Sequence, residues 1–188
     1  VHPDWQGKVI ADLNFELPAH AHNTQDAIRC TYEYADFIRQ FTDSLTVPKE
    51  AYPDGITVLS PIETWSDDFS MAIAGIPSTV NDFSAGPFMQ NYYHSQYDNQ
   101  DVYQEAVYQF HHECYLKLVM AFDRLVLPPM NFSNTIKAVI SGIHENALSF
   151  ASEEQDNLTA RLEKVQELCS QVYTHICQIN QKYAKLTA

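Results

Sequence analysis

The stretch G-K-V-I-A-D-L-N-F-E-L-P, residues 7–18, decides the class of fold that this sequence predicts. It is a short apolar run that Pro18 ends, which is typical of a strand buried on both faces in a parallel sheet. Asp12 lies in its middle, where a lone carboxylate is costly unless another group pairs with it. The stretch therefore predicts an α/β fold in which Asp12 has a partner.

The period of the apolar residues changes several times after this strand. The predicted elements are a helix at 23–43, a strand at 56–59, a short helix at 67–74, a strand at 76–80 and a long amphipathic helix at 101–127. Asn23 is expected to cap the first of these helices, and Gly75 suits the C-terminal end of the second. Pro128 and Pro129 end the last one.

Two more helices are predicted after residue 128. One runs along the apolar stripe from Ile136 to Phe150, and the other begins at Ser152. In the last helix, apolar residues alternate at spacings of four and three: Leu158, Leu162, Val165, Cys169, Val172, Ile176, Ile179, Tyr183 and Leu186. Such an a/d seam calls for a partner helix, either the preceding helix folded back, another subunit, or both. The expected architecture is α/β over 1–127 followed by an α-helical hairpin over 128–188.

The composition limits the functions that the chain can have. With 188 residues and 45% apolar residues it can bury a core, and its net charge of −13 argues against binding nucleic acid. No apolar run is long enough for a membrane span. The four cysteines form no C-x-x-C pair and are expected to be buried thiols, which together with the lack of a leader favours a cytoplasmic location. The first strand lacks neighbours for a full parallel sheet, so a larger parent protein or pairing with a second copy is expected.

Four short stretches resemble, in the same order, motifs of zinc exopeptidases with two co-catalytic metals. S-D-D-F-S-M-A-I-A-G-I-P (66–77) resembles their Ser-Asp-His-x-x-Phe-x-x-x-Gly-Ile-Pro stretch, and Y-Y-H-S-Q-Y-D (92–98) resembles the segment with their last metal-binding histidine. G-K-V-I-A-D-L-N-F-E (7–16) resembles the strand that delivers a metal-binding aspartate. R-L-V-L-P (124–128) resembles the junction into the helical dimerisation domain of the glutamate-carboxypeptidase and transferrin-receptor branch.

The resemblance implies roles for three residues in binding zinc and in catalysis. Asp12 is expected to bind one zinc ion and His94 the other, because carboxylate and imidazole are ligands that zinc accepts. Tyr93 corresponds to the tyrosine that donates a hydrogen bond to the oxyanion of the tetrahedral intermediate. Taken alone, Asp12 could equally be a buried carboxylate paired with a polar group, and His94 a ring packed among aromatic residues.

Three further residues are weaker candidates for the same site. Ser66 and Asp67 begin the first motif and are candidates for contacts with substrate, although Ser66 could instead cap the short helix. Asp98 is expected to orient a tyrosine or histidine side chain behind the metal ligands. His20 and His22 follow the first strand and are interpreted as residues of a solvated loop.

The chain also departs from the pattern of the family. The family needs an earlier histidine, a bridging aspartate and two glutamates from segments upstream of Asp12, and this chain has none of them. The parent protein is therefore predicted to hydrolyse peptide bonds with a hydroxide bound by two zinc ions, whereas this chain alone is expected to be inactive and to hold no zinc stably. Where glutamate-releasing members carry arginines, the chain has Val80 and Asp82, so a preference for acidic residues is not expected. Asp68 stands where the family has a histidine.

Two other functions remain open at the level of sequence. The transferrin-receptor branch implies that the same architecture can serve as a non-catalytic scaffold. The long seam alternatively indicates a module for oligomerisation, with a homodimer formed through helices 135–186. A peptide substrate in the parent protein and a second copy of the chain are thus the expected partners.

Overall fold

The chain divides into two compact units in a computed structural model, which describes residues 3–5, 7–20, 23–82, 87–145 and 152–184. The first unit, built on a sheet, consists of residues 1–31 and 37–124. The second unit is helical and consists of residues 32–36 and 125–188.

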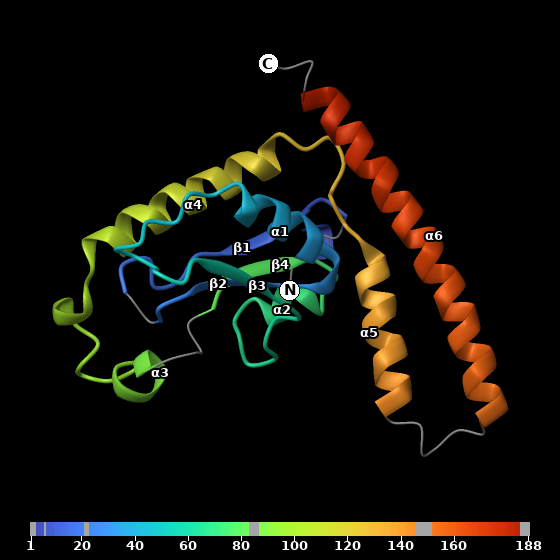
Figure 1. The fold of residues 1–188 in the computed structure, drawn as a ribbon, viewed down its shortest axis with the longest axis horizontal. Coiled ribbons are helices and arrows are strands. Elements are labelled where there is room, and N and C mark those ends of the chain that lie inside the picture. The colour runs from blue at the N-terminus through green and yellow to red at the C-terminus, as the bar shows by residue number, and fades with distance from the viewer. Residues whose placement is uncertain (1–2, 6, 21–22, 83–86, 146–151, 185–188) are drawn as a thin grey trace. The chain divides into compact units, whose positions relative to one another are not determined.

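A four-stranded mixed sheet forms the centre of the first unit (Figure 1). The strands are β1 (Asp12–Asn14), β2 (Asp26–Cys30), β3 (Ile56–Leu59) and β4 (Ser78–Asn81), in the spatial order β1-β4-β2-β3. β1 is parallel to β4 and β2 is parallel to β3, whereas β2 and β4 are antiparallel. The predicted α/β class is confirmed in this broad sense.

The first strand is shorter and more exposed than the sequence predicts. Of residues 7–18, only Asp12–Asn14 form a strand, and all three residues are half-buried. Within the described sheet, β1 is an edge strand whose one neighbour is β4, and its half-buried residues show that its two faces are not both fully covered. The prediction of a fully buried strand over residues 7–18 is therefore wrong.

The predicted helix from Asn23 to Asp43 is wrong in its first half. Residues Asp26–Cys30 form β2, which lies between β3 and β4 and is mostly buried. Helix α1 begins only at Ala35, after a 3-10 turn at Tyr32–Tyr34, and ends at Asp43. Asn23 consequently caps no helix, and its side chain instead accepts a hydrogen bond from the backbone of Thr24.

The other helices of the first unit are α2 (Phe69–Ala72), α3 (Pro87–Asn91) and α4 (Glu105–Asp123), with 3-10 turns at Pro3–Trp5 and Gln100–Val102. Of these helices, α2 and α4 agree more closely with the sequence pattern, whereas α3 was not predicted. Gly75 follows α2 with a φ of 82°, the left-handed conformation expected of a residue that ends a helix. α4 runs alongside the sheet (Figure 1) and buries six residues: Val107, Phe110, His111, Cys114, Leu118 and Phe122.

The helical unit contains α5 (Phe132–Glu145) and α6 (Ser152–Ala184), which pack against each other. Asn131 precedes α5, and its side-chain oxygen accepts hydrogen bonds from the backbone and hydroxyl of Ser133 at 3.1 and 2.6 Å. This arrangement satisfies donors at the start of the helix. The predicted helical hairpin is present as far as the described residues extend, and residues 146–150 of the predicted stripe lie outside them.

The face of α6 that is least exposed is not the whole predicted seam. Most of its half-buried and buried residues recur at spacings of three and four: Thr159, Leu162, Gln166, Cys169, Tyr173, Ile176 and Asn180. Cys177, next to Ile176, is also half-buried. Five other seam positions are exposed, namely Leu158, Val165, Val172, Ile179 and Tyr183, and Leu186 lies outside the described residues. The seam is thus divided between one packed face and one open face of the same helix.

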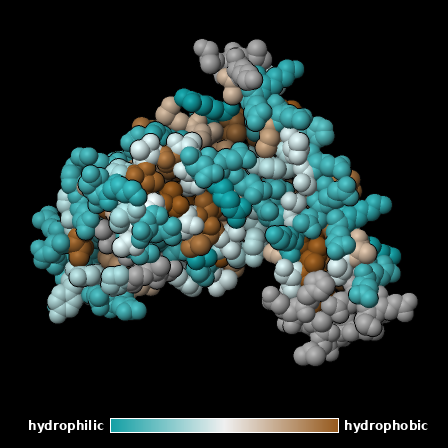
Figure 2. All heavy atoms as spheres, in the orientation of Figure 1, coloured by the Kyte–Doolittle hydropathy of each residue, from teal (hydrophilic) through white to brown (hydrophobic). Residues whose placement is uncertain are grey.

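The surface is mostly hydrophilic on the face drawn in Figure 2, with hydrophobic residues gathered in a few places. No helix in the described ranges is both long and apolar enough to cross a membrane. The four cysteines, all within the described residues, form no disulfide; Cys30 and Cys114 are buried, as predicted, while Cys169 and Cys177 are half-buried.

Candidate functional site

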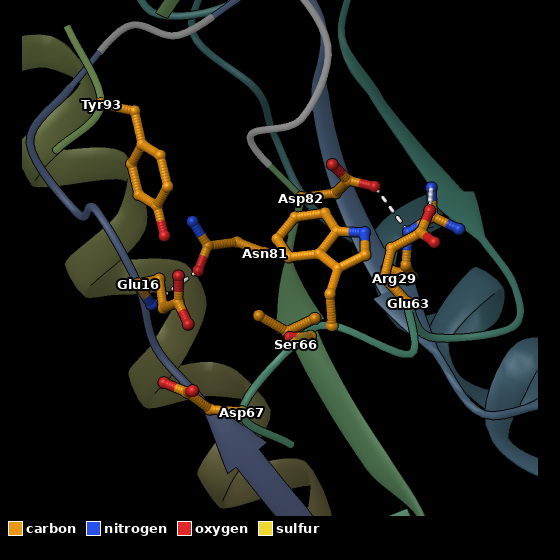
Figure 3. Close-up of a pocket in the computed structure, with 10 residues that line it drawn as sticks. Glu16, Arg29, Glu63, Ser66, Asp67, Asn81, Asp82 and Tyr93 are labelled. Carbon is orange, nitrogen blue, oxygen red and sulfur yellow. Dashed lines mark hydrogen bonds and ion pairs between the residues drawn. The ribbon is translucent and has the colours of Figure 1, made fainter. Parts of the chain in front are cut away.

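A small cavity of about 60 Å³ opens near the ends of the central strands in the first unit (Figure 3). Its lining consists of Glu16, Arg29, Glu63, Trp65, Ser66, Asp67, Val80, Asn81, Asp82 and Tyr93. Glu16 follows β1, and Asn81 ends β4. Because β1 and β4 are parallel, their carboxyl ends meet at one edge of the sheet. Open α/β sheets bind ligands at this edge, so the cavity is the candidate functional site.

Arg29 holds one wall of the cavity together. Its Nε donates to Oδ2 of Asp82 at 2.6 Å, and its Nη2 lies 3.2 Å from Oε1 of Glu63. A third bond runs from Nη1 to the carbonyl oxygen of Pro61 at 2.9 Å. Only 16% of the Arg29 side chain and 5% of the Asp82 side chain are exposed. The guanidinium is thus committed to two carboxylates of the protein itself.

Glu16 and Asn81 form a second wall, between the ends of β1 and β4. The backbone nitrogen of Glu16 donates to Oδ1 of Asn81 at 2.7 Å, and Nδ2 of Asn14 donates to Oε1 of Glu16 at 2.8 Å. Asn81 is only 3% exposed, and its Nδ2 is buried without a hydrogen-bond partner among the described residues. This buried donor is a feature that a ligand could satisfy.

Tyr93 closes the cavity from the loop after α3, with its hydroxyl pointing toward Asn81 and Glu16 in Figure 3. Burial, followed by the negative charges of Glu16 and Asp67, raises the pKa of the Tyr93 hydroxyl above its ordinary value. The group therefore stays protonated near neutral pH and remains a hydrogen-bond donor.

The backbone next to two of the lining residues is strained. Leu17, after Glu16, has a φ of 45°, and His94, after Tyr93, has a φ of 54°. These are the two residues other than glycine with positive φ in the described ranges. Left-handed conformations are unfavourable for residues with a β-carbon, most of all for a bulky leucine, and they cluster at functional sites.

The two predicted zinc ligands lie outside the lining of the cavity. Asp12 is half-buried at the start of β1; burial, and next the carboxylate of Asp68, raise its pKa, while a hydrogen bond from Ser78 lowers it. His94 is exposed, and its ring stacks on that of Tyr93 with the centroids 3.9 Å apart. Asp12 therefore lies near a hydroxyl group and a second carboxylate. His94 contacts an aromatic ring, as expected from the tyrosines that precede it in the sequence.

Zinc sites use three or four ligands from histidine, cysteine, aspartate and glutamate. Within the part of the chain that the structure describes, no group of three or more such residues is placed to hold a metal ion. Asp12 and His94 therefore do not complete a zinc site with other described residues of this chain.

The weaker candidates fall partly inside the site. Ser66 and Asp67 both line the cavity, and the Ser66 hydroxyl donates to the buried carboxylate of Asp68. Asp98 lies 3.4 Å from Nδ1 of His20 and thus contacts a different histidine from His94. His20 is half-buried, with its ring edge against Phe88, so its interpretation as a solvated loop residue is wrong; His22 lies outside the described residues.

The sequence pattern did not single out Glu16, Arg29 or Asn81 as site residues. Arg29 lies in a segment for which the sequence predicts a helix, and it lines the cavity because β2 pairs with β4. Glu16 and Asn81 meet because β1 and β4 are paired in parallel with Asn14 opposite Val80. The signal available in the sequence was that both residues follow an apolar strand, which is where ligands bind in such sheets.

Comparisons of the chain with protein-family models, with curated protein sequences and with solved structures found no match. The interpretation of the site therefore rests on the four sequence stretches and on the geometry of the cavity.

Replacing Glu16 with glutamine is expected to stabilise the chain at pH 7. Burial raises the pKa of this carboxyl above its ordinary 4.5, as do Asp67 and Asp68, while the hydrogen bond from Asn14 lowers it. A carboxyl group with a raised pKa contributes stability below its unfolded-state pKa and loses that contribution as the pH rises through the folded-state pKa. Ionised Glu16 therefore lowers the free energy of unfolding at pH 7, and glutamine removes this effect.

Thermal unfolding of Glu16→Gln and of the original chain between pH 7 and pH 4 tests this expectation. The variant is expected to have the higher Tm at pH 7, with the difference narrowing as the pH falls toward 4.5 and below. Glu50→Gln, a change at an exposed glutamate, is the control and is expected to leave Tm unchanged at each pH. A lower Tm for Glu16→Gln at pH 7 would contradict the assignment.

Proposed function

We propose that this chain is the C-terminal part of an exopeptidase that uses two zinc ions and hydrolyses peptide bonds from one end of the substrate. In this proposal Asp12 and His94 each supply one ligand, and the zinc ions take their other ligands from residues outside this chain. Tyr93 donates a hydrogen bond to the oxyanion that forms on the scissile carbonyl. The helical unit supplies contacts for dimerisation.

The convergence of Ser66, Asp67 and Tyr93 on one cavity is the observation that carries the proposal. The first two come from the motif before α2 and the third from the motif after α3, and the sequence resemblance assigned all of them to one site. The cavity lies at the carboxyl edge of β1 and β4, where ligands of α/β sheets bind. If these stretches resembled the family motifs only by chance, their residues would not be expected to line the same cavity.

The conformation of His94 supports a role for this residue beyond packing. Its ring is exposed although it stacks on Tyr93, so burial of apolar surface contributes little to holding it. Its φ of 54° is unfavourable by about 1–2 kcal/mol for a residue with a β-carbon. A strained, exposed histidine beside the cavity is typical of a side chain positioned for binding.

Zinc content and hydrolysis of aminoacyl and dipeptide substrates by the full-length parent protein test the proposed function. The parent is expected to contain two zinc ions and to be active, and His94→Ala is expected to lose zinc and activity together. Tyr93→Phe is expected to keep zinc and to lower kcat by about 100-fold or more, since it removes one oxyanion donor.

His112→Ala is the matched control, because His112 is an exposed histidine on α4 outside the cavity. It is expected to leave both zinc content and activity unchanged. A parent protein with neither zinc nor activity overturns the enzymatic proposal and favours a non-catalytic scaffold of the transferrin-receptor type.

Self-association is a second candidate function, and the open face of α6 favours it. Leu158, Val165, Val172 and Ile179 are exposed at intervals of seven residues along one helix. Nearby, a groove of about 330 Å³ is lined by apolar side chains: Leu127, Pro128, Met130, Phe132, Val165, Leu168, Cys169, Val172 and Ile176. A second copy carries the same stripe, and a two-fold axis brings two such stripes together.

Val172→Asp is expected to convert a dimer of the chain to a monomer in light scattering. Val172 is 59% exposed, so the charge is placed on the open face with little effect on the fold. Ile176 is left unchanged because it also lies on the packed face of α6. Gln171→Asp adds the same charge at the neighbouring exposed position and is expected to leave the mass unchanged. The same mass for the Val172 variant and the original chain counts against this interface.

A further inference from the structure

The cavity of the first unit is acidic even though it contains an arginine. Its lining includes four carboxylates, those of Glu16, Glu63, Asp67 and Asp82, and one guanidinium, that of Arg29, so its formal charge is −3. Arg29 is bound to Asp82 and Glu63 at 2.6 and 3.2 Å. The cavity therefore offers no positive group to an anionic ligand and favours a cation.

Asn81 adds a hydrogen-bond donor to this acidic surrounding. The 2.7 Å bond from the backbone nitrogen of Glu16 requires an acceptor and so fixes which end of the amide is the oxygen. The other end, Nδ2, belongs to a residue that is 3% exposed and has no partner within the described ranges. Figure 3 shows this nitrogen on the side of Asn81 that faces Tyr93. A ligand that satisfies Nδ2 must present an acceptor such as a carbonyl oxygen.

The rim of the cavity provides two aromatic residues with different roles. The hydroxyl of Tyr93 points toward Asn81, where it is a second donor to the same acceptor (Figure 3). Trp65 also lines the cavity and is 57% exposed. The face of an indole attracts cations, including ammonium groups.

We propose that this cavity binds the free amino-terminal residue of a peptide. The ammonium group lies against the carboxylates of Glu16 and Asp67, and the carbonyl oxygen of the same residue accepts hydrogen bonds from Asn81 Nδ2 and the Tyr93 hydroxyl. The assignment of a peptide as ligand rests on the proposed function, whereas the requirement for an ammonium group beside a carbonyl follows from the charges and donors of the cavity.

The size of the cavity agrees with this ligand. A volume of 60 Å³ has room for about four to six water-sized groups. The ammonium nitrogen, the α-carbon and the carbonyl group of one residue fill such a space, and the side chain and the rest of the peptide extend outward. Under this inference the parent protein removes residues from the amino end and not from the carboxyl end.

Titration of the 188-residue chain with small amides, followed by NMR with zinc absent, tests the inference. L-Alaninamide carries both groups, N-acetyl-L-alaninamide lacks the ammonium, and propylamine lacks the carbonyl. Alaninamide is expected to bind at least about tenfold more tightly than either of the others. The acetylated amide cannot place an ammonium group against the carboxylates, and propylamine has no carbonyl oxygen to accept hydrogen bonds. Equal binding of the acetylated amide, or no shift of cavity resonances with alaninamide, overturns the inference.

Two variants locate the binding in the cavity. Glu16→Gln removes a charge and Asn81→Leu removes the donor without adding a charge, and each is expected to weaken alaninamide binding by about tenfold. Asp123→Asn, at an exposed carboxylate outside the cavity, is expected to change nothing. Thermal unfolding of every variant shows that it is folded during the titration, and unchanged affinity in folded Glu16→Gln overturns the assigned site.

The outcomes separate this inference from the proposed function. If the chain binds alaninamide but the parent protein has neither zinc nor activity, the inferred ammonium site is supported and the proposed peptidase function is wrong. Hydrolysis by the parent without alaninamide binding by the chain keeps the peptidase and overturns the ammonium site.

Discussion

Replacing His111 with leucine is expected to lower the free energy of unfolding of this chain by about 3 kcal/mol, the upper end of the cost of leaving a buried hydrogen-bonding group without its partner. His111 is fully buried on α4, and its Nε2 lies 3.4 Å from Oδ1 of Asp26 in β2. The same nitrogen lies 3.2 Å from the hydroxyl of Tyr52. Leucine offers neither group a hydrogen bond, and the exposed fraction of Asp26 is only 1%, so water replaces little of what is lost.

The neighbouring residue provides the control for this prediction. His112→Leu changes the same residue type on the same helix at an exposed position and is expected to alter the free energy of unfolding by about 0.5 kcal/mol or less. Urea unfolding followed by circular dichroism measures both variants. Adding Asp26→Asn to the His111→Leu variant is expected to recover part of the loss, because a neutral amide is less costly to bury than a carboxylate. A His111→Leu variant as stable as its His112 counterpart would show that the pair does not hold α4 to the sheet.

The sequence predicted the long helix α4 but not the strand β2, for a physical reason. In α4 the buried residues Val107, Phe110, Cys114 and Leu118 recur with the helical period, so the pattern itself reports the buried face. In β2, the residues D-A-I-R-C contain one β-branched side chain and no clear alternation. This segment is a strand because β3 and β4 pair with it on both sides, which is tertiary context that local preference does not contain.

The same limit applies to the candidate site. Ser66, Asp67 and Tyr93 were found because each lies in a stretch with a recognisable order of residues, and all three line the cavity. Arg29 and Asn81 reach the cavity through the register of the sheet, which a single sequence does not specify for short strands. On α6, the sequence predicts the apolar seam but not its division into a packed and an open face. That division also involves polar residues of the packed face, such as Asn180, whose side chain forms hydrogen bonds with the backbone of Leu127.

Replacing Arg29 with methionine is expected to destabilise the chain by about 3 kcal/mol, near the lower end of the range for breaking a buried ion pair, because part of this side chain reaches solvent. Methionine has a comparable apolar stem but gives Asp82 and Glu63 no positive group. Asp82, with 5% of its side chain exposed, then loses its 2.6 Å partner in surroundings where water substitutes poorly. Urea unfolding measures the loss.

Lysine and a distant arginine serve as controls for this change. Arg29→Lys keeps the charge but not the fork that reaches Asp82, Glu63 and the carbonyl of Pro61 together, so an intermediate loss is expected. Arg124→Met, at an exposed arginine, is expected to cost about 0.5 kcal/mol or less. If Arg124→Met destabilises the chain as much as Arg29→Met, the destabilisation is caused by losing any arginine and not by losing the ion pair with Asp82.

The Arg29 variant also distinguishes the charge of the ligand that the cavity takes. Removing the guanidinium makes the formal charge of the lining more negative, and it leaves Asp82 and Glu63 without their bound cation. If the ligand is an ammonium group, Arg29→Met, titrated below its unfolding temperature, is expected to bind alaninamide at least as tightly as the original chain. If the arginine instead receives a carboxylate of the ligand, affinity for acetate or N-acetylalanine falls in this variant, and the amino-terminal assignment is wrong.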